Sequence, residues 1–123
     1  MSDKPVTERL QVKGGRRLAT VAAPAELEQL LGGSELRAGL READIVLVFV
    51  RDHASFKAQV TATLPSLRPG AILWVAYPKL TSKLAGELNR DVLRAAAPKF
   101  GLDTVSQIAL DDDWSALRLK RVP

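Results

Sequence analysis

The sequence has no cysteine, a single histidine and few aromatic residues, which make up 5% of the chain. Without cysteine, the chain can form no disulfide, no thiol nucleophile and no thiolate metal site. No apolar run approaches the roughly 20 residues that a membrane-spanning helix needs. Residues 1–5 are followed by no apolar stretch of the kind that marks a secretory signal. We therefore expect a protein of the reducing cytoplasm that has no membrane partner.

Charge of one sign is not concentrated anywhere in the chain. The formal net charge is +4, which raises the question of nucleic-acid binding. The basic residues are scattered, however, and the only run of three like charges is acidic, Asp111-Asp112-Asp113. Scattered cations are typical of a solvated surface. A nucleic-acid-binding module is therefore only the second alternative.

The length and composition correspond to one globular domain. The 123 residues are 46% hydrophobic and 26% charged, a usual balance for a folded domain of this size. Residues 43–50 (ADIVLVFV) and 71–77 (AILWVAY) are unbroken apolar runs typical of strands buried on both faces. Residues 17–23, which come first along the chain, show a less pronounced strand pattern and are predicted to form the third parallel strand. Residues 104–110 and 114–120 are strand-like and so close in sequence that they must form an antiparallel hairpin.

Helical patterns fill the spaces between these strands. Pro24 and residues 25–31 predict a first helix that ends at Gly32-Gly33. Apolar residues at helical spacing predict a second helix through Phe56, Val60, Leu64 and Leu67. A third helix, capped by Thr81 or Ser82, has the apolar stripe Leu84, Leu88, Val92 and Ala95 or Ala96. Alternating strands and helices predict right-handed crossovers, hence one three-layer α/β domain with a mostly parallel sheet over residues 1–123.

Two segments are less defined. Residues 1–14 are predicted to form an N-terminal arm, either extended or with a short helical turn. Residues 34–42 allow two interpretations, a short helix capped by Ser34 or a short edge strand, because Leu36 and Leu40 lie four apart. We leave both alternatives open.

Several segments resemble known families. Residues 64–75, LPSLRPGAILWV, place an LRPG turn before a buried strand. This order resembles the second half of Rossmann-like S-adenosylmethionine-dependent methyltransferases, whose corresponding strand is followed by a helix and a terminal antiparallel hairpin. The resemblance spans residues 15–121 and implies that fold. The segments FVRD (49–52), WVAYPK (74–79) and DWSALR (113–118) resemble a small bacterial family known only as a domain of unknown function. That second resemblance implies the fold and no activity.

The methyltransferase resemblance also implies a cofactor site, and the residues depart from it. Working methyltransferases place a glycine-rich loop after the first strand and an acidic residue after the second. The corresponding loop here is Ala22-Ala23-Pro24-Ala25, which contains no glycine and lacks one amide donor. Only Glu35 or Glu42 could serve as the acidic residue. We therefore expect a degenerate site that holds no cofactor.

Ligands of open α/β sheets bind beyond the carboxyl ends of the parallel strands. Hydroxyls and lysines at a helix start in this position could hold a phosphate or carboxylate. The alternative is that a hydroxyl only caps the helix while the lysines are solvated. The candidate anion-binding residues at this edge are Arg51, Lys79, Thr81, Ser82 and Lys83.

The other candidate sites have simpler explanations. Asp52 and His53 are neighbours in sequence and so rarely point the same way, which favours a solvated or helix-starting histidine and no catalytic residue. The three aspartates lack the alternating ligands and glycine of a calcium loop, so a polar turn is expected and no metal site. Trp74, in the middle of a strand, is expected in the core.

The favoured hypothesis is a non-catalytic binding or interaction domain on a degenerate methyltransferase-like frame. It carries the expectation of a small anionic ligand and leaves room for a homodimer. The alternative is a reduced S-adenosylmethionine-dependent methyltransferase, or another enzyme with a nucleotide-like ligand. A filled loop at residues 22–25 favours the first hypothesis, and an open cleft favours the second.

Overall fold

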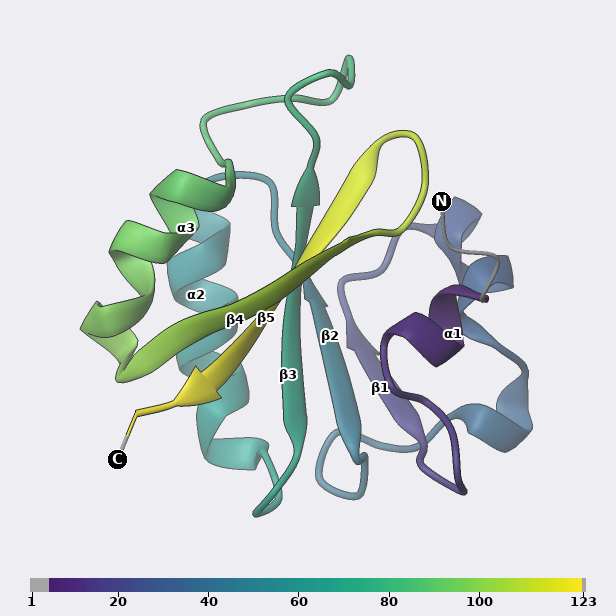
Figure 1. Cartoon of the computed structure of the whole chain (residues 1–123). Helices are drawn as coiled ribbons and strands as arrows, with labels where there is room; N and C mark the ends of the chain where they lie inside the picture. Colours follow the sequence, from purple (N-terminus) through teal and green to yellow (C-terminus); the bar gives the residue numbers. More distant parts are fainter. Residues whose placement is uncertain (1–4, 123) are drawn as a thin grey trace.

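The computed structural model describes residues 5–122, in which a twisted five-stranded sheet runs through the middle of the molecule (Figure 1). The strand order is β1-β2-β3-β5-β4. The first three strands are mutually parallel, and β5 is antiparallel to both β3 and β4. The strands are β1 (Leu18–Val21), β2 (Ile45–Phe49), β3 (Ile72–Pro78), β4 (Leu102–Ala109) and β5 (Trp114–Arg121). The predicted parallel strands and terminal hairpin are confirmed.

Helical segments cover both faces of the sheet, as predicted for a three-layer domain. The α-helices are α1 (Val6–Arg9), α2 (His53–Thr63) and α3 (Arg90–Ala96). The 3₁₀ segments are η1 (Ala25–Leu31), η2 (Ser34–Leu36), η3 (Leu64–Ser66) and η4 (Ala97–Phe100). α2 and α3 lie on one face, and α1 and η1 lie on the other (Figure 1).

Strand β2 explains why the core has two sides. All five of its residues are buried, and successive side chains of a strand point to opposite faces. Val46 and Val48 pack with Phe56 of α2, whereas Ile45 and Leu47 pack on the α1 face. The continuous apolar run in the sequence therefore supplies both layers at once.

The N-terminal segment is part of the core. Val6, Leu10 and Val12 are buried, and the indole Nε1 of Trp74 donates a hydrogen bond of 3.1 Å to the carbonyl oxygen of Leu10. The predicted helical turn is confirmed, but the interpretation as an arm is wrong for residues 5–12, because they pack against the sheet. The first four residues of that prediction lie outside the described part of the chain.

The connection from β1 to β2 wraps around the free edge of β1. Leu36 packs on the α1 face, whereas Ala38 and Leu40 pack on the α2 face. Between them, Arg37 forms a single parallel bridge to Leu18. Residues 34–42 thus combine a 3₁₀ turn with one edge bridge, and Gly33 rather than Ser34 occupies the N-cap position.

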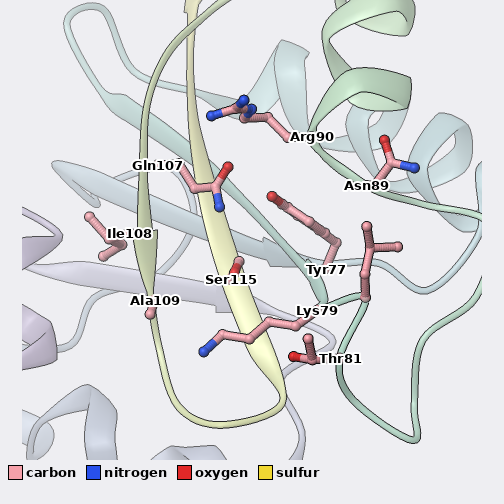
Figure 2. A pocket seen from close by; sticks show the side chains of 10 residues that line it. Tyr77, Lys79, Thr81, Asn89, Arg90, Gln107, Ile108, Ala109 and Ser115 are labelled. Carbon is pink, nitrogen blue, oxygen red and sulfur yellow. The ribbon is translucent and has the colours of Figure 1, made fainter.

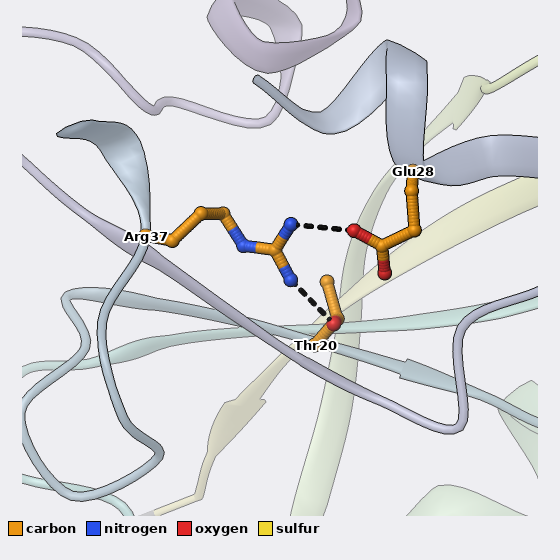
Figure 3. Close-up of polar contacts among 3 residues, drawn as sticks. All are labelled: Thr20, Glu28 and Arg37. Carbon is orange, nitrogen blue, oxygen red and sulfur yellow. Dashed lines mark hydrogen bonds and ion pairs between the residues drawn. The ribbon is translucent and has the colours of Figure 1, made fainter. Parts of the chain in front are cut away.

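The Arg37 side chain holds the connection between β1 and β2 in place through hydrogen bonds (Figure 3). Its guanidinium donates to the Glu28 carboxylate and to the Thr20 hydroxyl, each at 2.7 Å. It therefore joins η1, η2 and β1. The predicted first helix is a 3₁₀ segment in which Leu27 and Leu31 are buried but Leu30 is 41% exposed.

The predicted start of the third helix is wrong. Helix α3 begins at Arg90, and the side chain of Asn89 caps it by accepting a 2.9 Å hydrogen bond from the Val92 N–H. The preceding residues form turns instead. The Ser82 hydroxyl donates a 2.7 Å hydrogen bond to the Asp113 carboxylate and accepts one of 2.9 Å from the Leu84 N–H, but no helix follows it directly. In residues 5–122, no helix is long and apolar enough to cross a membrane.

Candidate functional site

Two separate cavities open near the carboxyl ends of the parallel strands. The first, here the β3–α3 cavity, has a volume of about 570 Å³ and lies between the end of β3, the start of α3 and the terminal hairpin. The second, here the loop cavity, has a volume of about 330 Å³ and lies beside the loop that follows β1. The β3–α3 cavity is lined by Tyr77, Lys79, Leu80, Thr81, Asn89, Arg90, Gln107, Ile108, Ala109 and Ser115. The loop cavity is lined by Ala22, Pro24, Phe49, Val50, Arg51, Asp52, Ser55, Gln59 and Trp114.

The β3–α3 cavity is cationic. Lys79 and Arg90 line it, and no carboxylate is among its lining residues. Figure 2 shows the Tyr77 hydroxyl directed toward the side chains of Gln107 and Arg90. Hydroxyl, amide and guanidinium groups can all donate hydrogen bonds. This wall is therefore suited to an acceptor that carries negative charge.

Tyr77 adds an uncharged donor. Its side chain is only 3% exposed, and burial raises the pKa of its phenol above the ordinary value of 10.0, an effect that the nearby Arg90 charge opposes. The phenol therefore keeps its proton at neutral pH and can donate it in a hydrogen bond.

The hairpin and the start of α2 hold the loop between β3 and α3. The Lys79 N–H donates to the Asp113 carbonyl oxygen at 2.8 Å. Farther along the loop, the Glu87 carboxylate accepts a 2.6 Å hydrogen bond from the backbone N–H of His53. These two contacts fix both ends of the segment that carries Lys79 and Thr81.

The five predicted anion-binding residues are not brought together. Lys79 and Thr81 line the β3–α3 cavity, and Arg51 lines the loop cavity. The Ser82 hydroxyl donates a hydrogen bond to the Asp113 carboxylate and accepts one from the Leu84 N–H. Lys83 is exposed and lines neither cavity. The premise of a helix start at Ser82 is wrong, because α3 begins later.

Sequence reasoning missed several residues that line the β3–α3 cavity. Asn89 is a favoured cap residue ahead of an apolar stretch, so its role at a helix start was a usable signal. With Asn89 as the cap, Arg90 would have been predicted as the first residue of the helix. Gln107 and Ser115 belong to the hairpin, and the register that sets Ser115 opposite Tyr77 has no local signal in the sequence.

The loop cavity is narrowed by side chains. Ala22 has a φ of +61°, a left-handed conformation that favours glycine, yet it carries a Cβ. Nearby, the Trp114 ring meets the Phe49 ring edge-on with centroids 5.2 Å apart. Side chains line this region, and a hollow of about 330 Å³ remains open between them.

Asp52 and His53 act at the start of α2. The Asp52 carboxylate accepts a 2.7 Å hydrogen bond from the Ser55 N–H, and the Ser55 hydroxyl accepts one of 3.1 Å from the Asp52 N–H. Hydrogen bonding to Ser55 lowers the pKa of Asp52. His53 is the first residue of the helix and is exposed. The helix-starting interpretation of the histidine is confirmed.

The three aspartates form the predicted polar turn. The Asp111 carboxylate accepts hydrogen bonds of 2.8 Å from the backbone N–H groups of Asp113 and Trp114. Within residues 5–122, no three or more His, Cys, Asp or Glu side chains are placed so that they could hold a metal ion together.

The sheet topology bears on the cofactor question. Doubly wound sheets bind nucleotides in the crevice where the strand order reverses direction. Among the described strands, β1, β2 and β3 follow one another in one direction and β1 is the edge. These parallel strands therefore provide no such reversal.

Solved structures support the fold assignment. Mitomycin 7-O-methyltransferase MmcR matches with a TM-score of 0.52 and 13% identity, covering 71% of this chain and 33% of that enzyme. A structure described as a pericyclic reaction enzyme matches with a TM-score of 0.50 and 12% identity, covering 94% of this chain and 39% of that one. This chain thus spans about a third to two fifths of those proteins. At this identity, the likeness establishes a methyltransferase-like fold alone.

Sequence comparison gives the family. No curated protein matches the chain. The family model described as "Protein of unknown function (DUF3052)" matches residues 24–122, a range that begins after β1 and contains β2 to β5. Because this match covers most of the chain, the protein belongs to the DUF3052 family.

Proposed function

We propose that this domain binds a small organic anion in the β3–α3 cavity and acts by binding rather than by catalysis. The observation that carries the proposal is the lining of that cavity, which holds Lys79 and Arg90 and no carboxylate. Its volume of about 570 Å³ lies within the usual range for small-molecule pockets.

The lining also favours an anion with an apolar part. Leu80, Ile108 and Ala109 line the cavity beside the cations, and Leu80 is 66% exposed. An apolar group resting on these side chains would remove them from water while its charged end meets the cations. A carboxylate or phosphate ester with a ring or short alkyl body fits this combination.

Non-catalytic binding is supported by the state of the side chains that could otherwise act as acids, bases or nucleophiles. The Asp52 carboxylate is bonded to Ser55, and His53 is an exposed residue at the helix start. The Tyr77 phenol keeps its proton because burial raises its pKa. None of these groups forms a nucleophile–base pair in the described part of the chain.

The proposal is tested by calorimetric titration with benzoate, phenyl phosphate and the neutral analogue benzamide. We expect saturable binding of the two anions and none of benzamide. Lys79→Gln and Arg90→Gln should each weaken binding about 10- to 100-fold, since a hydrogen bond to a charged group contributes about 1.5–3 kcal/mol.

Arg51→Gln is the matched control, because it removes the same charge at the same edge of the sheet but outside the cavity. It should leave the affinity unchanged. The proposal fails if neither anion binds, or if Arg51→Gln weakens binding as much as Lys79→Gln.

A further inference from the structure

A second cationic cavity lies at the opposite end of the sheet. It has a volume of about 380 Å³ and lies between the turn that precedes β3 and the end of β5. Arg68 comes from the turn, and Arg118, Lys120 and Arg121 come from β5. No carboxylate is among the lining residues. We refer to it as the basic cavity.

Two of its arginines are held in place by backbone contacts. Arg121 donates to the Leu64 carbonyl oxygen at 2.7 Å. Arg68 donates to the Glu42 carbonyl oxygen at 3.3 Å and lies 3.2 Å from the Asp44 carboxylate. Each guanidinium has five N–H donors, so these contacts leave further donors for a ligand.

Arg118 is the least satisfied of the four. Its Nε is buried, and it has no hydrogen-bond acceptor within residues 5–122. Lys120 lies on the same face of β5 as Arg118, and its register partner on β4 is Asp103. A bound anion would supply an acceptor for the N–H groups of Arg118 that line the cavity.

We propose that the basic cavity binds the phosphate group of a small phosphorylated molecule. Guanidinium groups favour phosphate because their planar forks can form paired hydrogen bonds to its oxygens. The apolar side chains of Leu64, Leu67 and Ile72 line the same cavity and can contact an uncharged remainder. This site is independent of the β3–α3 cavity, since the two share no lining residue.

The probe is pyrophosphate, titrated calorimetrically into the full chain at constant ionic strength. We expect saturable binding that is weakened at least about tenfold by Arg118→Gln and by Lys120→Gln, as for the loss of one charge-assisted contact. Lys120 is exposed, so its variant keeps the test valid if Arg118→Gln does not fold. Lys57→Gln, an equal charge change on an exposed position outside this cavity, should have no effect.

Three outcomes would overturn the proposal. They are an absence of saturable binding, equal weakening by Lys57→Gln, and tighter binding of a 20-base-pair DNA duplex whose affinity falls steeply with salt and depends equally on all these cations. Lys79→Gln should not change pyrophosphate affinity. That variant therefore separates failure of this site from failure of the β3–α3 cavity.

Discussion

The guanidinium carbon of Arg51 lies 5.7 Å from the centre of the Trp114 ring, at the edge of the sheet where β2 ends. Both residues line the loop cavity together with Ala22 and Pro24. Trp114 is 2% exposed and belongs to the core on the α1 face. The hairpin thus places a core side chain next to the loop where the methyltransferase resemblance implies a cofactor.

We expect S-adenosylmethionine to leave the thermal unfolding midpoint unchanged. The loop cavity of about 330 Å³ is near the lower limit for small-molecule pockets, and its loop has no glycine. A ligand present at 100 times its dissociation constant would add about 2.7 kcal/mol to the free energy of unfolding. Differential scanning fluorimetry at millimolar S-adenosylmethionine checks this. A rise of several degrees would contradict it and would favour the enzyme alternative.

Ala22→Gly should stabilise the protein. Ala22 has a φ of +61°, where a Cβ costs about 1–2 kcal/mol, while glycine loses more backbone entropy on folding. The net expectation is a gain of about 1 kcal/mol in the free energy of unfolding, measured by urea denaturation. Ala23→Gly is the matched control: Ala23 has no positive φ, so its variant should be neutral or less stable. A loss of stability in Ala22→Gly would show that the methyl group makes contacts worth more than the strain.

The sheet could be predicted from sequence because its signals are local. The run from Ile45 to Phe49 is apolar at every position, and such a run can be satisfied only between two packed layers. The start of α3 could not be predicted in this way. Ser82 and Asn89 are both favoured cap residues, and both side chains accept a hydrogen bond from a backbone N–H two or three residues later, so local chemistry alone does not select Asn89 as the helix start.

Only the part of the β3–α3 cavity that follows the end of β3 could be predicted from the sequence. The rule that ligands bind at carboxyl strand ends led to Lys79 and Thr81, which do line a cavity. Arg51 obeys the same rule but lies in a different cavity. The opposite wall depends on the register between β3 and β5, which brings Ser115 beside Tyr77, and such pairing across the sheet has no signature in either segment alone.

Trp74→Phe should test the anchor of the N-terminal segment. The Trp74 indole donates to the Leu10 carbonyl oxygen, and phenylalanine would fill much of the space but leave that oxygen without its donor. An unsatisfied buried polar group costs about 1–3 kcal/mol. Trp74→Ala should cost more, about 3–5 kcal/mol, because it also leaves a cavity. Chemical denaturation gives both values, and hydrogen exchange at residues 6–12 should rise in Trp74→Phe. Equal stability of Trp74→Phe and the parent protein would contradict this anchoring role.

The charge on Asp52 should make the stability fall at low pH. Hydrogen bonds from the Ser55 backbone and side chain lower the pKa of Asp52 in the folded protein below its ordinary value of 3.8. Because the folded pKa is the lower one, the contribution to stability is fully present above pH 3.8 and is lost as pH falls through the folded pKa.

Asp52→Asn isolates this effect, because asparagine is also a good cap but does not titrate. Thermal unfolding midpoints measured between about pH 2 and pH 6 should converge at the acid end, where the parent carboxyl is protonated, and separate as the pH rises. Asp52→Ala removes the cap as well and should be less stable than the parent protein throughout this range. If the difference between the parent protein and Asp52→Asn did not change with pH, the carboxylate would not be stabilised by its contacts at the start of α2.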